Sequence, residues 1–127
     1  MTIAEIKELI RKDETRTLEL KKTTGELKDA MHTVCAFLNT SGGQLLFGIA
    51  PSSLQVIGQQ VTDNTRREIA RDLTKIEPAV SLDVDYIELD GKSDFYVIVI
   101  DARLSRTETV PMCTMVGRTT GLRAPHR

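Results

Sequence analysis

The spacing of apolar residues along this chain predicts three helices. An isoleucine at every third or fourth position indicates a short helix near the N-terminus. A longer apolar face over residues 27–38 follows Thr23 and Glu26, which have the spacing of a capping box. A third helix starts at residues 62–63 and is expected to run until Pro78 ends it.

Strands are predicted where apolar and polar residues alternate, or where turn residues bound an apolar run. Alternation near the N-terminus places Glu19 and Lys21 on one face of a strand. The nearly continuous apolar run at residues 95–100 predicts a central strand that is buried on both faces. The predicted strands are residues 17–21, 44–49, 54–57, 80–89, 95–100 and 112–116.

The order of these elements predicts an α/β (α+β) fold in which about three helices pack on a single mixed β-sheet. A length of 127 residues and a mass of 14.1 kDa match one domain. We assign residues 1–101 to this domain. Residues 102–127 are then a basic C-terminal extension that holds the last strand and a tail.

Composition narrows the classes of function. The formal net charge is -1, so overall charge does not by itself indicate nucleic-acid binding. Aromatic residues make up 4% of the chain and Trp is absent, which argues against a stacking platform for single-stranded nucleic acid. Cys35 and Cys113 lack the spacing of zinc ligands, and no apolar run is long enough to span a membrane. We therefore expect a cytoplasmic protein without a membrane partner.

Charge is distributed unevenly along the chain. Residues 76–101 hold seven acidic residues and one basic residue, whereas residues 102–127 hold five basic residues and one acidic residue. Arg118 and Arg123 in the second segment are candidate phosphate contacts, with a solvated tail as the alternative. A second basic face is predicted on the third helix, with plain exposed helix surface as the alternative. Its residues are Arg66, Arg67 and Arg71.

Two motifs that lie one helix apart carry a family resemblance. The first spans residues 14–21 and contains Glu-x-Lys at Glu19 and Lys21 on a predicted strand. The second spans residues 36–43 and reads Ala-Phe-Leu-Asn-Thr-Ser-Gly-Gly, in which a glycine can end the helix in the left-handed conformation. Together these motifs resemble the Schlafen/AlbA-like DNA-binding domain family, over about residues 14–100.

The resemblance implies a nucleic-acid-binding α/β module that is often joined to further domains, so a partner domain outside this chain is one expectation. Bacterial members are commonly described as transcriptional regulators or helicase-related proteins, and animal Schlafen relatives include ribonucleases. In those nucleases two glutamates of the first motif and an acid after the Gly-Gly strand are the metal-binding carboxylates. Glu14 and Glu19 match the first two positions, but Ala-Pro-Ser-Ser at residues 50–53 supplies no third acid.

Two glutamates alone form a weak site for a hard divalent cation, which needs two or three converging carboxylates. The odd spacing of Glu14 and Glu19 lets them converge only if Glu14 lies in a turn before the strand. Glu19 can instead pair with Lys21 on the same strand face. We therefore expect no catalytic residue, metal or cofactor. Mg²⁺ or Mn²⁺ is expected only under the alternative that the protein is a nuclease, with Asp63 or Asp101 as the third acidic ligand.

Lys21 and Lys22 stand just before the second helix, whose N-terminal N–H groups attract anions, so we expect a phosphate there, with solvated lysines as the alternative. The predicted function is a regulatory nucleic-acid-binding domain, a transcriptional regulator that binds DNA rather than RNA and forms a homodimer. The alternatives are a metal-dependent ribonuclease of the Schlafen type and a protein-interaction module. That module would use an uncovered sheet edge and the acidic residues 83–94.

Overall fold

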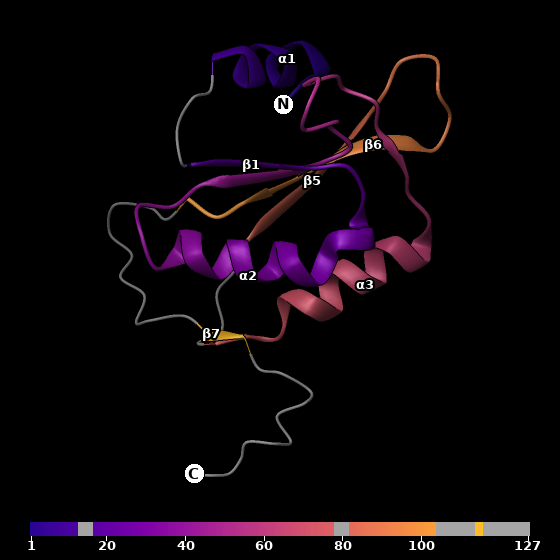
Figure 1. Ribbon diagram of the computed structural model, residues 1–127. Helices are drawn as coiled ribbons and strands as arrows, with labels where there is room; N and C mark the ends of the chain where they lie inside the picture. Colours follow the sequence, from indigo (N-terminus) through magenta and orange to yellow (C-terminus); the bar gives the residue numbers. More distant parts are fainter. Residues whose placement is uncertain (13–16, 78–81, 104–113, 116–127) are drawn as a thin grey trace, which may run out of the picture.

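Three stacked layers make up the protein in a computed structural model that describes residues 1–12, 17–77, 82–103 and 114–115. Helix α1 (Ile3–Lys12) covers one face of a five-stranded mixed sheet. Helices α2 (Leu27–Leu38) and α3 (Asp63–Leu73) cover the other face (Figure 1). The predicted α+β class, with three helices on a mixed sheet, is confirmed.

Strand β6 (Phe95–Asp101) is the centre of this sheet. Strand β5 (Asp83–Glu88) pairs antiparallel with one side of β6. Strands β2 (Gln44–Phe47) and β3 (Gln59–Gln60) pair antiparallel with successive parts of its other side. Strand β1 (Leu18–Lys21) then extends the sheet as the parallel neighbour of β2. The prediction of a central strand at residues 95–100 is confirmed.

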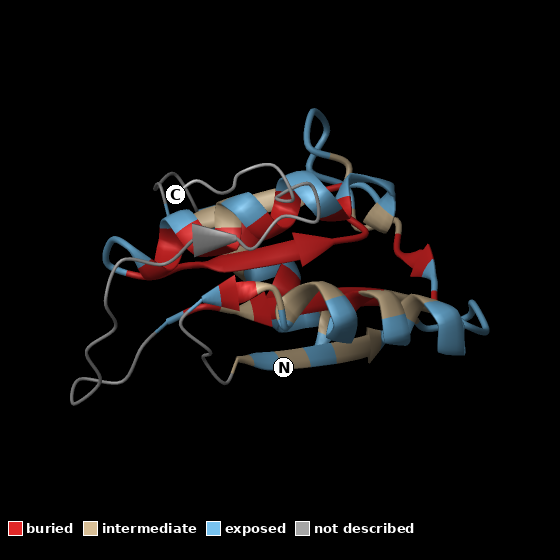
Figure 2. Ribbon diagram, turned by 90° about the horizontal axis from the view of Figure 1, so that it is seen from below, coloured by how far each residue is buried: buried red, intermediate tan, exposed pale blue. Residues whose placement is uncertain are grey.

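Two apolar layers fill the spaces between the sheet and the helices. Figure 2 shows the buried residues along the strands of the sheet and on parts of the helices. Because side chains alternate along a strand, Ile98 and Ile100 of β6 pack in the layer that contains α2. Val97 and Val99 pack in the layer on the other face, with Ile6 of α1. All of these residues are buried. The apolar run in β6 is therefore shared between two cores, which explains why it lacks polar positions.

The predicted strand at residues 54–57 is wrong. In that region Ile49 and Val56 form only an isolated β-bridge, and the next strand of the sheet is β3. Val56 packs in the same apolar layer as Ile6, on the α1 side of the sheet, without belonging to a strand. An apolar run bounded by turn residues was therefore not sufficient to identify a strand.

Residues 48–58 instead form a loop that leaves the edge of β6 after β2 and returns to it at β3 (Figure 1). We call it the 48–58 loop. Gly48 and Gly58 lie where the loop leaves and rejoins the sheet, a place that we call its neck. Their φ angles are positive, at 98° and 71°. The N–H of Gly58 donates to the C=O of Gly48 at 2.8 Å. A side chain at either glycine would meet atoms of the neck or of the adjacent hairpin, so the two backbone segments can approach closely.

Helix α3 ends at Leu73, earlier than predicted. The hydroxyl of Thr74 donates to the C=O of Arg71 at 2.6 Å and closes the last turn. The following residues form β4 (Ile76–Glu77), which pairs with β7 (Thr114–Met115) as a separate two-stranded sheet. This partner is distant in sequence, so local periodicity did not indicate it. A strand within the predicted last segment is thus present, but outside the main sheet.

The predicted capping box of Thr23 and Glu26 is also wrong. The hydroxyl of Thr23 accepts from the N–H of Gly25 at 3.1 Å and caps a 3₁₀ turn, η1 (Thr24–Glu26), ahead of α2. Glu26 does not return to cap the backbone of Thr23, because its carboxylate pairs with Lys21. Among the described residues no helix has the length and apolar content that crossing a membrane requires.

We expect Gly48→Ala to destabilise the fold much more than Gly91→Ala. Both glycines have a positive φ, 98° and 78°, which costs an alanine about 1–2 kcal/mol. A Cβ at Gly48 would also lie 3.0 Å from the Cα of Gly58, whereas a Cβ at Gly91 would meet open space. Denaturant unfolding should therefore show a loss of at least about 3 kcal/mol for Gly48→Ala. Equal losses would contradict close packing at the neck.

Candidate functional site

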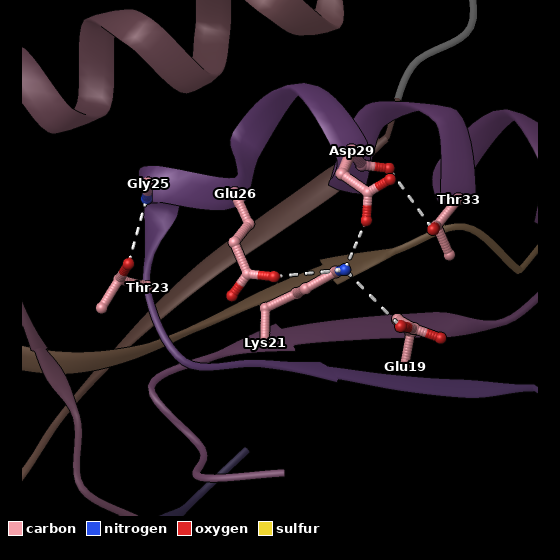
Figure 3. A network of polar contacts seen from close by, with 7 residues as sticks. All are labelled: Glu19, Lys21, Thr23, Gly25, Glu26, Asp29 and Thr33. Atoms are coloured by element: carbon pink, nitrogen blue, oxygen red, sulfur yellow. Dashed lines mark hydrogen bonds and ion pairs between the residues drawn. The ribbon is translucent and has the colours of Figure 1, made fainter.

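Lys21 is the buried charge at the centre of the first candidate site. It is the last residue of β1, and its side chain, which is 10% exposed, lies beneath the start of α2 (Figure 3). Its ammonium lies 2.6 Å from a carboxylate oxygen of Asp29, 3.5 Å from Glu26 and 3.8 Å from Glu19. The pairing of Glu19 with Lys21 is confirmed, within a network of three carboxylates.

These contacts shift the pKa of both closest partners. The hydrogen bond from Lys21 holds the pKa of Asp29 below its ordinary value of 3.8. The same hydrogen bond raises the pKa of Lys21 above 10.5, and it outweighs burial, which acts in the opposite direction. Lys21 is therefore charged at neutral pH, with its ammonium among protein carboxylates. A phosphate could approach this ammonium only by displacing one of them.

The described residues do not fit a divalent metal ion at this place. The carboxylate of Glu19, which the family resemblance suggests as a ligand, faces the ammonium of Lys21. In the part of the chain that the structure describes, no three His, Cys, Asp or Glu residues are grouped to hold a metal. Asp101, a candidate third acid, accepts two hydrogen bonds from the guanidinium of Arg103, at 2.9 and 2.7 Å. Glu14 lies outside the described residues.

Helix α3 carries the second candidate site on its exposed side. Its first turn is fixed by a capping box of Thr62 and Thr65, which accept and donate reciprocally. Arg67 and Arg71 are four residues apart, so their side chains leave the same side of the helix. Both are exposed, and the Nε of Arg71 lies 3.4 Å from the carboxylate of Asp72. The predicted basic helix face therefore reaches the surface.

Arg66, the third arginine of this helix, packs on two tyrosines that sequence reasoning did not single out. Its guanidinium carbon lies 4.0 Å from the ring centroid of Tyr86 and 5.7 Å from that of Tyr96. The rings are T-shaped, with centroids 6.4 Å apart. Burial raises the pKa of Tyr86, partly opposed by the charge of Arg66. Only the register between β5 and β6 brings the tyrosines together, and the sequence does not give that register.

Lys22 is exposed between β1 and η1, at the end of the molecule where α3 begins (Figure 1). Two hydrogen bonds join this segment to the strand that leads into α3. The N–H of Thr24 donates to the buried side-chain oxygen of Gln59 at 2.7 Å, and the Gln59 amide donates to the Thr24 hydroxyl at 3.1 Å. The remaining predicted phosphate contacts, Arg118 and Arg123, lie outside the described residues.

Comparisons with known proteins relate the chain to one family. Residues 14–115 match the model of the family described as Schlafen, AlbA_2. Among solved structures, the N-terminal domain of a RecG-related protein from Nitrosomonas europaea matches with a TM-score of 0.60 and 24% identity, over 81% of this chain and 73% of that chain. The DIP2311 protein from Corynebacterium diphtheriae matches with a TM-score of 0.49 and 16% identity, over 90% and 26%. A comparison with curated proteins found no significant match.

Removing Lys21 is expected to cost less stability than neutralising its partners. In Lys21→Met the three carboxylates, whose side chains are 42–71% exposed, stay hydrated, so the free energy of unfolding should fall by about 1 kcal/mol. The triple variant Glu19→Gln/Glu26→Gln/Asp29→Asn leaves a buried ammonium without a carboxylate, which is the costlier state. Urea unfolding of the two variants makes the comparison, and a larger loss for Lys21→Met would contradict it.

The pairing of Lys21 with Asp29 should stabilise the fold within a defined pH range. Because the pKa of Asp29 is lowered, this contribution is present above 3.8 and is lost as the pH falls through the lowered pKa. Because the pKa of Lys21 is raised, the contribution is present below 10.5 and is lost as the pH rises through the raised pKa. The unfolding free-energy difference between wild type and Lys21→Met should be level between these limits. A step near neutral pH would contradict the assignment.

Proposed function

Because this chain belongs to the Schlafen AlbA_2 family, we propose that it is a nucleic-acid-binding domain. The observation that carries the proposal is the set of exposed arginines on α3, a helix that begins at the end of the molecule where β1 leads into η1 (Figure 1). The RecG-related protein of similar fold has a name that refers to an ATP-dependent DNA helicase, which favours DNA as the ligand. A regulatory role, as in a transcriptional regulator, is part of this proposal.

Arg67, Arg71 and Lys22 are proposed to contact phosphate oxygens, because their side chains reach solvent with their charges exposed. Arg66 has a different part. Its guanidinium lies over the ring of Tyr86, which restricts rotation of the arginine side chain. The planar group is thereby held at the surface with its N–H donors available. Lys21 is proposed to act indirectly, by holding the start of α2 against β1. Such contacts place the domain on the nucleic-acid backbone without reading its sequence.

A homodimer is an added part of the proposal. The formal net charge of -1 gives a monomer little long-range attraction to DNA, so joining two arginine faces would strengthen binding. Arg118 and Arg123 in the C-terminal extension would contribute further phosphate contacts. Gel filtration with light scattering tests the dimer separately. A monomer at all concentrations would remove the dimer from the proposal and leave the binding face in place.

The double variant Arg67→Ala/Arg71→Ala is expected to weaken binding to a labelled DNA duplex about tenfold, or roughly 1.4 kcal/mol. Fluorescence anisotropy at several salt concentrations should also show the slope of log K against log salt falling by about one for each phosphate contact removed. Lys12→Ala is the matched control, since this exposed lysine lies on α1, on the other face of the sheet. An equal loss in both variants would contradict the assigned face.

Cleavage and binding assays distinguish the proposed function from its two alternatives. Structured RNA is incubated with the protein in Mn²⁺ or in chelator, and cleavage that needs the metal and disappears in Glu19→Ala would replace the proposal with a ribonuclease. DNA and RNA that fail to bind even at low salt would favour a protein-interaction module, because phosphate contacts strengthen as salt falls. Binding of nucleic acid without cleavage, with a steep salt slope, is the expected result.

A further inference from the structure

A cleft of about 690 Å³ lies on the α1 side of the sheet, across the sheet from α3. Three elements form its walls: α1, the 48–58 loop, and the turn between β5 and β6 (Figure 1). Its floor is aliphatic, with Ile10, Val56 and Leu89 continuing the apolar layer beneath α1. This volume lies within the range of pockets that hold small ligands or the anchoring side chains of peptides.

Basic side chains surround this aliphatic floor. Lys7 and Arg11 are one helical turn apart on α1, and Lys92 projects from the β5–β6 turn. All three are exposed, and Lys92 lies over the ring of Phe95, 5.1 Å from its centroid. Among the described lining residues Asp90 is the one acid, and Arg11 also pairs with Glu8 of the same helix. The α1 wall therefore carries two basic side chains, one of them paired with Glu8, and the opposite wall carries Lys92 beside Asp90.

Leu54 at the tip of the 48–58 loop is strained and exposed at the same time. Its φ is 63°, a left-handed conformation that a branched side chain rarely adopts, and it remains 48% exposed. The loop holds it there, because the N–H of Leu54 donates to the C=O of Ala50 at 2.7 Å. Asn or Gly would satisfy this turn with less strain. A leucine here adds little to the core and stays available to an apolar group that enters the cleft.

We propose that this cleft binds an acidic peptide segment of a protein partner. One aliphatic side chain of the peptide packs between Leu54 and the floor, and its flanking carboxylates pair with Lys7 and Lys92. The rim charges set orientation and association rate, while the buried aliphatic anchor supplies most of the affinity. The described lining lacks aromatic rings for stacking bases and has an aliphatic floor for one apolar side chain, so a peptide fits better than a single-stranded nucleic acid.

The first experiment selects the ligand with the full-length chain. A display library of short random peptides should be enriched in sequences that place Leu, Ile or Val among Asp and Glu. Titration of the isotope-labelled chain with one selected peptide should then shift amide signals of α1, the 48–58 loop and the β5–β6 turn. Absence of enrichment, enrichment of basic sequences, shifts confined to α3, or displacement of the peptide by single-stranded DNA would each overturn the proposal.

Variants of the cleft complete the test. Leu54→Asn should keep or raise the melting temperature, because Asn tolerates the left-handed conformation, and should weaken the selected peptide at least about tenfold. Lys7→Glu/Lys92→Glu should weaken it at least as much and reverse its salt dependence, because added salt then screens repulsion where it screened attraction in the wild type. Lys28→Glu, an exposed lysine on α2, is the control and should leave peptide binding unchanged. Wild-type affinity in both cleft variants would overturn the proposal. The α3 arginines are not involved, so DNA binding is scored independently.

Discussion

The structure depends on one strand that must be buried on both faces and paired on both sides. β6 pairs with β5 along one side and with β2 and β3 along the other, so its backbone groups are used within the sheet. Its side chains alternate between the layer beneath α1 and the layer beneath α2. A polar residue at Val97 to Ile100 would therefore meet an apolar core whichever way it pointed.

The polar site at the end of β1 follows from this arrangement. β1 adds to the sheet through β2, and its alternation sends Leu18 and Leu20 to the α1 layer and Lys21 beneath α2. The residues that open α2 then supply carboxylates to the buried ammonium. The cation that these carboxylates bind is therefore a side chain of the protein itself, Lys21. Glu19, which the family resemblance suggests as a metal ligand, shares this internal cation.

The two proposed surfaces lie on opposite faces of the sheet, which lets them be occupied together. The arginine face belongs to α3, whereas the cleft is built on α1 and on two loops at one end of the sheet. Each surface combines a rigid helix with side chains from segments far away in sequence. The guanidinium of Arg66 on α3 lies over Tyr86 of β5. The cleft combines Lys7 of α1 with Lys92 of the β5–β6 turn. The two proposals together describe a module that joins nucleic acid to a protein.

The three helices, the central strand and the placement of Glu19 and Lys21 on one strand face could be predicted from the sequence alone. Each of these depends on residues that are close along the chain, where periodicity and spacing act directly. The tertiary fold was needed to show that residues 54–57 lie outside the sheet, that Ile76 pairs with Met115 and does not extend α3, and that Arg66 lies over two tyrosines. These outcomes depend on strand register and on contacts between distant segments, whose free energies local patterns do not contain.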